Sequence, residues 1–111
     1  MKKETIDLER FRTPNAKVFT GRDRGREVRD KSKIDELEGT SDEITIIIPE
    51  DIRSINPSFL EEFLVNVVTK LKEDGFRKKF IFLNKSTRYK IENDLSEAID
   101  RILRNDTALT K

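Results

Sequence analysis

One segment limits the fold of this chain more than any other: an apolar run that leads through a short bend into an amphipathic stretch. The run is Ile44-Thr-Ile-Ile-Ile48, and Pro49 follows it. Consecutive β-branched residues predict a strand that is buried on both faces, and the proline ends its hydrogen-bond ladder. Apolar residues then recur every fourth position from Phe59 to Leu71, which predicts a helix from Pro57 to about Lys72, closed by Asp74-Gly75.

The elements that follow repeat this alternation. Phe80-Ile-Phe-Leu83 reads as a second buried strand, and apolar spacing from Leu95 to Leu103 predicts a second amphipathic helix. Two strands joined by a helix form a βαβ unit, in which the strands are parallel. Lys17-Val-Phe19 predicts a further strand, and the sequence predicts a helix over residues 21–31, with a continuation towards Leu37 left open. The sequence therefore predicts an α/β domain.

Apolar residues are concentrated in the second half of the chain. Of its 111 residues 34% are hydrophobic and 41% are charged, which suits a single domain with one modest core. We expect an N-terminal extension over residues 1–16, whose order the sequence leaves open. The domain itself is expected over residues 17–105, followed by a C-terminal tail over residues 106–111.

Composition narrows the function classes. The chain has no cysteine and no histidine, which excludes a thiolate nucleophile, a disulfide framework and an imidazole or thiolate zinc site. Glu61 and Glu62 are adjacent and diverge by about 100° on a helix, so they do not form a converging acid–base pair. Glycine-rich phosphate loops are not present either. We expect a protein that is not an enzyme and has no metal or cofactor.

The charge balance and the hydropathy pattern indicate which classes of partner and which location to expect. Lys and Arg total 23 against 22 for Asp and Glu, so no net field favours nucleic acid. The charged start and the short apolar runs predict neither a signal segment nor a membrane span, and we expect a cytoplasmic location. Two basic clusters keep a nucleic-acid alternative open if the fold joins them: one surrounds Gly75, from Lys70 to Lys79, and the other runs from Lys85 to Lys90.

The start of the helix after the Ile44 strand is the strongest candidate site. Ser54, Asn56 and Ser58 surround it, and backbone N–H groups and the helix dipole favour negative charge there. Asn56 can cap the helix with Pro57 in its first position, or Ser58 can cap it with Glu61 completing a capping box. The segment is then either a simple cap or a site for a phosphate or carboxylate.

A second candidate is an arginine group on the helix predicted after Phe19. Arg22, Arg26 and Arg29 fall on one face at spacings of four and three, which could hold a phosphate or an acidic partner. The alternative is a salt-bridged surface, because Asp23, Glu27 and Asp30 are interleaved with these arginines.

Three segments carry a resemblance to a known family. They are Val18-Phe-Thr-Gly-Arg22, Ile52-Arg-Ser-Ile-Asn-Pro-Ser-Phe-Leu-Glu-Glu-Phe63, and Gly75-Phe76 with the strand that ends near Asn84. From Lys17 to Arg104 the chain resembles the STAS-like domain family of unknown function, which is related in outline to the STAS domains of anti-sigma-factor antagonists. The resemblance implies a small single-domain mixed sheet of about three or four strands with helices packed on it. It also implies a non-enzymatic regulator that binds a protein partner.

In those antagonists the helix after the central strand opens with an Asp-Ser-Ser-Gly-like motif, whose second serine is phosphorylated by an ATP-binding kinase-like partner. Laid on this chain, Asn56 stands at the aspartate, Pro57 at the first serine, Ser58 at the phosphorylated serine and Phe59 at the glycine. Only Ser58 matches. The resemblance thus implies a partner surface from Ser54 to Glu62, with Ser58 as its switch and Glu61 within it. A phosphate or nucleotide binder that uses the same helix start is the alternative.

Overall fold

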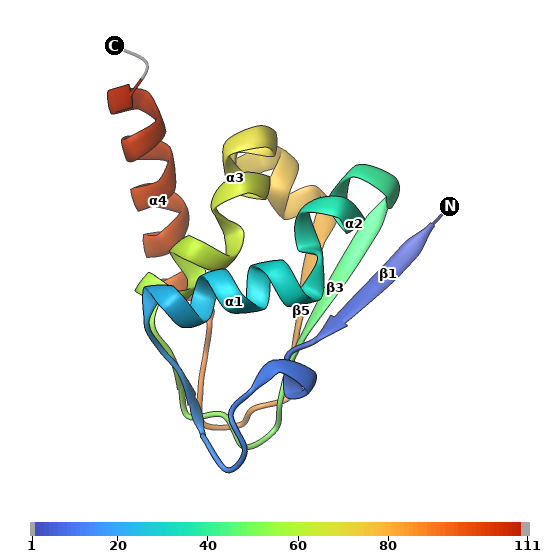
Figure 1. Cartoon of the computed structure of the whole chain (residues 1–111), viewed down its shortest axis with the longest axis vertical. Coiled ribbons are helices and arrows are strands. Elements are labelled where there is room, and N and C mark those ends of the chain that lie inside the picture. Colours follow the sequence, from blue (N-terminus) through green and yellow to red (C-terminus); the bar gives the residue numbers. More distant parts are fainter. Residues whose placement is uncertain (1, 110–111) are drawn as a thin grey trace.

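The computed structural model describes the backbone of residues 2–109 and the side chains of residues 2–105. Figure 1 shows a three-stranded sheet with helices to one side of it. The strands are β1 (Lys3–Asp7), β2 (Val18–Phe19), β3 (Glu43–Ile48), β4 (Ser54–Ile55) and β5 (Phe80–Asn84). The helices are α1 (Arg22–Ser32), α2 (Ile34–Thr40), α3 (Pro57–Lys79) and α4 (Glu92–Leu109), and a 3-10 turn, η1, covers Leu8–Phe11.

The main sheet has the order β1-β3-β5, and both of its strand pairs are parallel. Ile46 at its centre is in register with Ile6 on one side and with Phe82 on the other. The parallel β3-α3-β5 unit predicted from the sequence is confirmed. The predicted mixed sheet is wrong, because both connections pass through helices and return the chain in the same direction. β2 and β4 form a separate parallel ladder, in which Phe19 pairs with Ile55.

The N-terminal residues belong to the fold, in contrast to the extension expected over residues 1–16. β1 pairs with β3 along its whole length, and Ile6 and Leu8 are buried in the core. At the other end, α4 continues through Leu109, so residues 106–109 of the expected tail are helical. Met1 and residues 110–111 lie outside the described residues. The domain therefore extends beyond the expected limits of 17 and 105 at both ends.

The helices follow the sequence pattern at their starts more closely than at their ends. α1 lies within one residue of its predicted range, and α3 begins at Pro57 as predicted. The regular turns of α3 are interrupted at Lys72, which has a positive φ of 61°, and helix resumes to Lys79 instead of ending at Gly75. Over residues 2–109 no helix combines the length and the apolar character that a membrane crossing needs.

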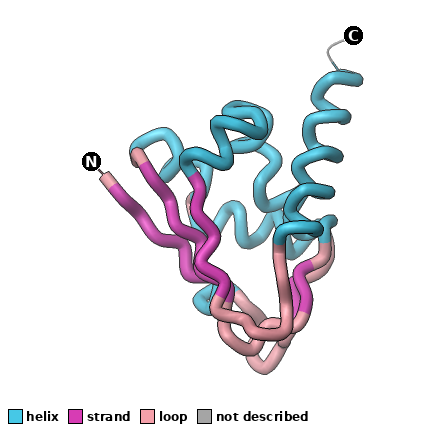
Figure 2. The backbone as a smooth tube through the Cα atoms, turned by 180° about the vertical axis from the view of Figure 1, so that it is seen from behind, coloured by secondary structure: helices cyan, strands magenta, loops and turns pink. Residues whose placement is uncertain are grey.

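The two faces of the main sheet differ. Ile44, Ile46 and Ile48 point to the inner face and are fully buried, whereas Thr45 and Ile47 between them are only partly buried. The prediction of burial on both faces is therefore wrong for β3. Figures 1 and 2 show the reason, since the helices all lie on one side of this sheet. We call the opposite side the outer sheet face; it carries Lys3, Thr5, Asp7, Glu43, Thr45, Ile47, Ile81 and Leu83.

Aromatic packing joins the short β2-β4 ladder to the helical layer. The rings of Phe19 and Phe59 lie 5.1 Å apart, and those of Phe59 and Phe63 lie 5.8 Å apart. All three side chains are buried. This contact fixes the start of α3 against β2 and α1, and so positions the predicted site.

Candidate functional site

The predicted site lies where β4 leads into α3. The Asn56 side chain accepts a hydrogen bond from the Ser58 N–H at 2.8 Å, and Pro57 occupies the first helical position. The structure thus selects Asn56 as the cap, and the alternative capping box of Ser58 with Glu61 is not formed. One of the free N–H groups of the first turn is satisfied by this bond, which is the role expected of an N-cap residue.

The two serines of the site differ in exposure. Ser54 is exposed on β4, whereas Ser58 is half-buried in the first turn of α3. Within the described part of the chain, the Ser58 hydroxyl makes no hydrogen bond. A hydroxyl in this position lies at the positive end of the helix dipole, where added negative charge is favourable.

Glu61 is the buried anion of the site, with 5% of its surface exposed. Arg101 of α4 donates to it at 3.0 Å, and Arg22 of α1 lies 3.5 Å from its other oxygen. The hydrogen bond to Glu61 is the main cause that raises the pKa of Arg101 above its usual value. Glu61 therefore ties the first turns of α3 to both α1 and α4.

Glu62 forms ion pairs with Arg22, Arg26 and Arg29, the three arginines that the sequence analysis places on one helix face. Its carboxylate lies 3.4 Å from Arg22, 3.8 Å from Arg29 and 3.9 Å from Arg26. Arg29 also donates to the Glu62 backbone carbonyl at 2.6 Å, and Arg26 pairs with Asp23. The two predicted groups thus meet and neutralise one another. This arrangement corresponds to the salt-bridged alternative and leaves the three arginines with carboxylate partners in place of an external anion.

The two basic clusters of the sequence lie at opposite ends of β5. Lys79 precedes the strand and Lys85 follows it, about 20 Å apart at the rise of an extended chain. Lys70 and Lys79 instead converge on the buried carboxylate of Glu38, at 2.8 and 3.0 Å. The fold does not join the clusters into one rim.

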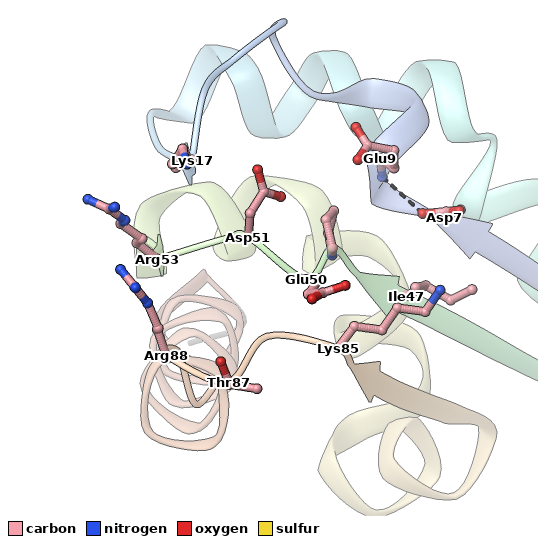
Figure 3. A pocket seen from close by; sticks show the side chains of 11 residues that line it. Asp7, Glu9, Lys17, Ile47, Glu50, Asp51, Arg53, Lys85, Thr87 and Arg88 are labelled. Atoms are coloured by element: carbon pink, nitrogen blue, oxygen red, sulfur yellow. Dashed lines mark hydrogen bonds between the residues drawn. The ribbon is translucent and has the colours of Figure 1, made fainter.

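The sequence interpretation missed a cleft of about 600 Å³ at the carboxyl ends of the three parallel strands. Figure 3 shows its lining, which begins with Asp7 at the end of β1 and includes Lys85 just after β5. Strand ends in parallel sheets are the usual place for ligands. The charged residues that follow each strand could have indicated this cleft. That inference needs the order of the strands in the sheet, and the sequence pattern did not identify β1.

The outer sheet face was missed for a related reason. Ile81 and Leu83 on β5 are 44% and 49% exposed, although the sequence predicts this strand as buried. Periodicity shows that a strand is apolar, but only the arrangement of the helices shows which face stays uncovered.

Comparison of the chain with protein-family models, with curated proteins and with solved structures finds no match. Among the residues that the structure describes, no group of three or more acidic side chains is arranged to hold a metal ion.

Proposed function

We propose that this protein is a non-enzymatic protein-interaction module whose outer sheet face receives an apolar helix of a partner protein. One observation carries the proposal: an all-parallel sheet presents Ile81 and Leu83 to solvent, at 44% and 49% exposure. All-parallel sheets occur almost only with both faces covered. A partner that covers this face would complete the usual three-layer arrangement.

The dimensions of the face favour a helix as its occupant. Three strands spaced about 4.8 Å apart, each about five residues long at about 3.3 Å per residue, form a surface of about 14 by 17 Å. A helix is about 10 Å in diameter, and about three turns span 17 Å.

The polarity of the face also resembles a binding surface. Its apolar part lies along β3 and β5, where Ile47 is in register with Leu83. Along β1 the face is polar, and the ion pair of Lys3 with Glu43, at 3.6 Å, marks one corner. An apolar centre with a polar rim is the common anatomy of protein interfaces.

The resemblance to STAS-like domains favours the same class of function, and both the family assignment and a regulatory role are part of the proposal. Ser58 is on the helical side of the sheet, so phosphorylation there would act on contacts around the start of α3 and not on the outer sheet face. Phosphate incorporation that is lost in Ser58→Ala tests this switch. A phosphate on Ser58 would add negative charge at a helix N-terminus, where such charge is favourable, so the fold should persist.

Site-specific photo-crosslinking tests the proposed surface. A photoreactive amino acid replaces Ile81 in the full chain, and the chain is irradiated in its native cells. We expect a crosslinked protein whose attached peptide lies in an amphipathic helix, and we expect Leu83→Asp in the same chain to abolish the product.

The matched control places the photoreactive residue at Val18, which is 45% exposed but lies on β2, away from the outer sheet face. The same products from both positions would contradict the proposal. Crosslinks from position 81 only to a second copy of the chain would contradict it as well.

A further inference from the structure

The cleft at the strand ends adjoins the outer sheet face, with which it shares Asp7 and Ile47, and it has the features of a small-molecule site. Its volume of about 600 Å³ falls within the range of about 300–1,000 Å³ of small-molecule pockets. Residues from the ends of β1, β3 and β5 and from the loops after β3 and β5 line it. This is the edge of a parallel sheet at which α/β proteins bind ligands.

Two arginines of the cleft have no side-chain partner among the described residues, whereas two of its acids are paired with Arg12. Arg12 donates to both oxygens of Asp51, at 2.6 and 3.0 Å, and lies 2.8 Å from Glu9. Over the residues whose side chains are described, Arg53 and Arg88 form neither a side-chain hydrogen bond nor an ion pair. Both guanidinium groups point to the same side of the cleft in Figure 3.

The loops that carry these arginines are fixed to each other by one hydroxyl group. Ser86 donates to the Ile52 carbonyl at 2.7 Å and accepts from the backbone N–H of Arg88 at 3.2 Å. The Arg53 N–H donates to the Lys17 carbonyl at 2.7 Å, which adds a third cation to the same frame. The backbone positions of Lys17, Arg53 and Arg88 are therefore set before any ligand arrives, which lowers the cost of binding.

The other end of the cleft carries two carboxylates beside Lys85. Asp7 ends β1, and Glu50 follows the end of β3; both line the cleft. Within the described chain neither carboxylate has an ion-pair partner, although Asp7 accepts the backbone N–H of Glu9 at 3.0 Å. Carboxylates at strand ends accept hydrogen bonds from sugar hydroxyls, while guanidinium groups bind phosphate through paired hydrogen bonds.

We propose that this cleft binds a small phosphorylated sugar, with the phosphate at Arg53 and Arg88 and the sugar hydroxyls at Asp7 and Glu50. The cleft is large enough for both parts, and it carries arginines for the phosphate and carboxylates for the hydroxyl groups. No aromatic side chain lines it, so the sugar phosphate and not a stacked base is the part that is recognised. The site is distinct from the start of α3, none of whose residues lines the cleft.

Isothermal titration calorimetry on the full chain, near physiological salt, tests the proposal with ribose 5-phosphate, inorganic phosphate and ribose. We expect ribose 5-phosphate to bind most tightly, inorganic phosphate to bind more weakly and ribose to give no signal. Arg53→Ala with Arg88→Ala should weaken ribose 5-phosphate binding roughly tenfold or more, because two charge-assisted contacts are lost.

Lys78→Ala with Arg104→Ala is the matched control. It removes the same charge from exposed positions that do not line the cleft, and it should bind as the unchanged chain does. Equal weakening in both double variants would overturn the proposal, and so would the absence of binding at millimolar ribose 5-phosphate. Inorganic phosphate that binds as tightly as ribose 5-phosphate would overturn it too. If the alanine pair does not fold by circular dichroism, Arg53→Gln with Arg88→Gln provides the same comparison.

Discussion

Gly25 is the residue on which the crossing of α1 and α3 depends. A Cβ atom at this position would lie 2.5 Å from the Phe59 backbone carbonyl oxygen and 2.8 Å from the Glu62 Cβ. The sequence shows only that a glycine weakens a predicted helix. The structure shows that its missing side chain allows α1 to approach the first turn of α3, and thereby brings Arg22 to Glu61.

Gly25→Ala should therefore destabilise the protein by about 1–3 kcal/mol, the usual cost of overpacking, although alanine favours a helix more than glycine does. Urea unfolding measures this change. Gly39→Ala is the control, because a Cβ there meets nothing within 4 Å, and it should be neutral or stabilising by up to about 1 kcal/mol. A Gly25→Ala variant as stable as Gly39→Ala would refute the close approach.

Glu38 is a buried carboxylate with two lysine partners, and we expect it to make the stability of the fold depend on pH. Burial raises its pKa, but hydrogen bonds from Lys70 and Lys79 outweigh burial, so the pKa in the folded state lies below its usual value of 4.5. A carboxyl group with a lowered folded pKa stabilises the fold above its unfolded pKa. This contribution is lost as the pH falls through and below about 4.5.

Glu38→Gln should lower stability by about 1–2 kcal/mol at pH 7 and lessen the loss of stability on acidification. Urea unfolding between pH 3 and pH 7 gives both quantities. Glu36→Gln on the same helix is the control, since the side chain of Glu36 is 75% exposed and its ion pair with Lys33 is 4.0 Å long. The two variants would have the same pH profile if the Glu38 cluster had no effect.

Among the secondary-structure elements, α3 combines two helical segments that meet at Lys72, where φ is 61° and ψ is 178°. The first segment ends about where the sequence predicts, whereas the second continues through Asp74-Gly75, which the sequence predicts as a helix stop. The backbone region of Lys72 is nearly restricted to glycine and costs about 1–3 kcal/mol for other residues. The second segment ends at Lys79, directly before β5, so the break allows α3 to turn the chain into the sheet.

Lys72→Gly should consequently stabilise the protein by about 1 kcal/mol through relief of backbone strain. Thermal unfolding followed by circular dichroism checks this. Lys78→Gly, in the regular second segment of the same element, should destabilise by about 1 kcal/mol instead. A loss of stability in both variants would mean that Lys72 is not strained.

The whole molecule shows which parts of the fold were visible in the sequence. β3 and the first segment of α3 were predicted because their patterns are local and strongly apolar. β1 was not, because Ile6 is the one buried apolar side chain of the five in this strand, and its partner β3 begins at Glu43. Without β1, neither the strand order nor the cleft at the strand ends could be derived.

The candidate site was predictable to a similar extent. The Asn56 cap depends on adjacent residues and was one of two alternatives derived from them. The pairing of Glu61 and Glu62 with arginines of α1 and α4 depends on how three helices cross, which spacing along one helix does not reveal. The uncovered outer sheet face likewise follows from the placement of every helix on the opposite side.

We propose that the apolar side chains of the outer sheet face bind a partner and contribute little to the stability of the chain itself. The free energy of unfolding of Ile81→Thr with Leu83→Thr, measured in urea, tests this most directly, because threonine keeps a high strand preference. We predict a change within about 1 kcal/mol for the double variant, and a loss of about 2 kcal/mol or more for Ile46→Thr on the buried face. A loss in the double variant as large as that of Ile46→Thr would contradict the claim.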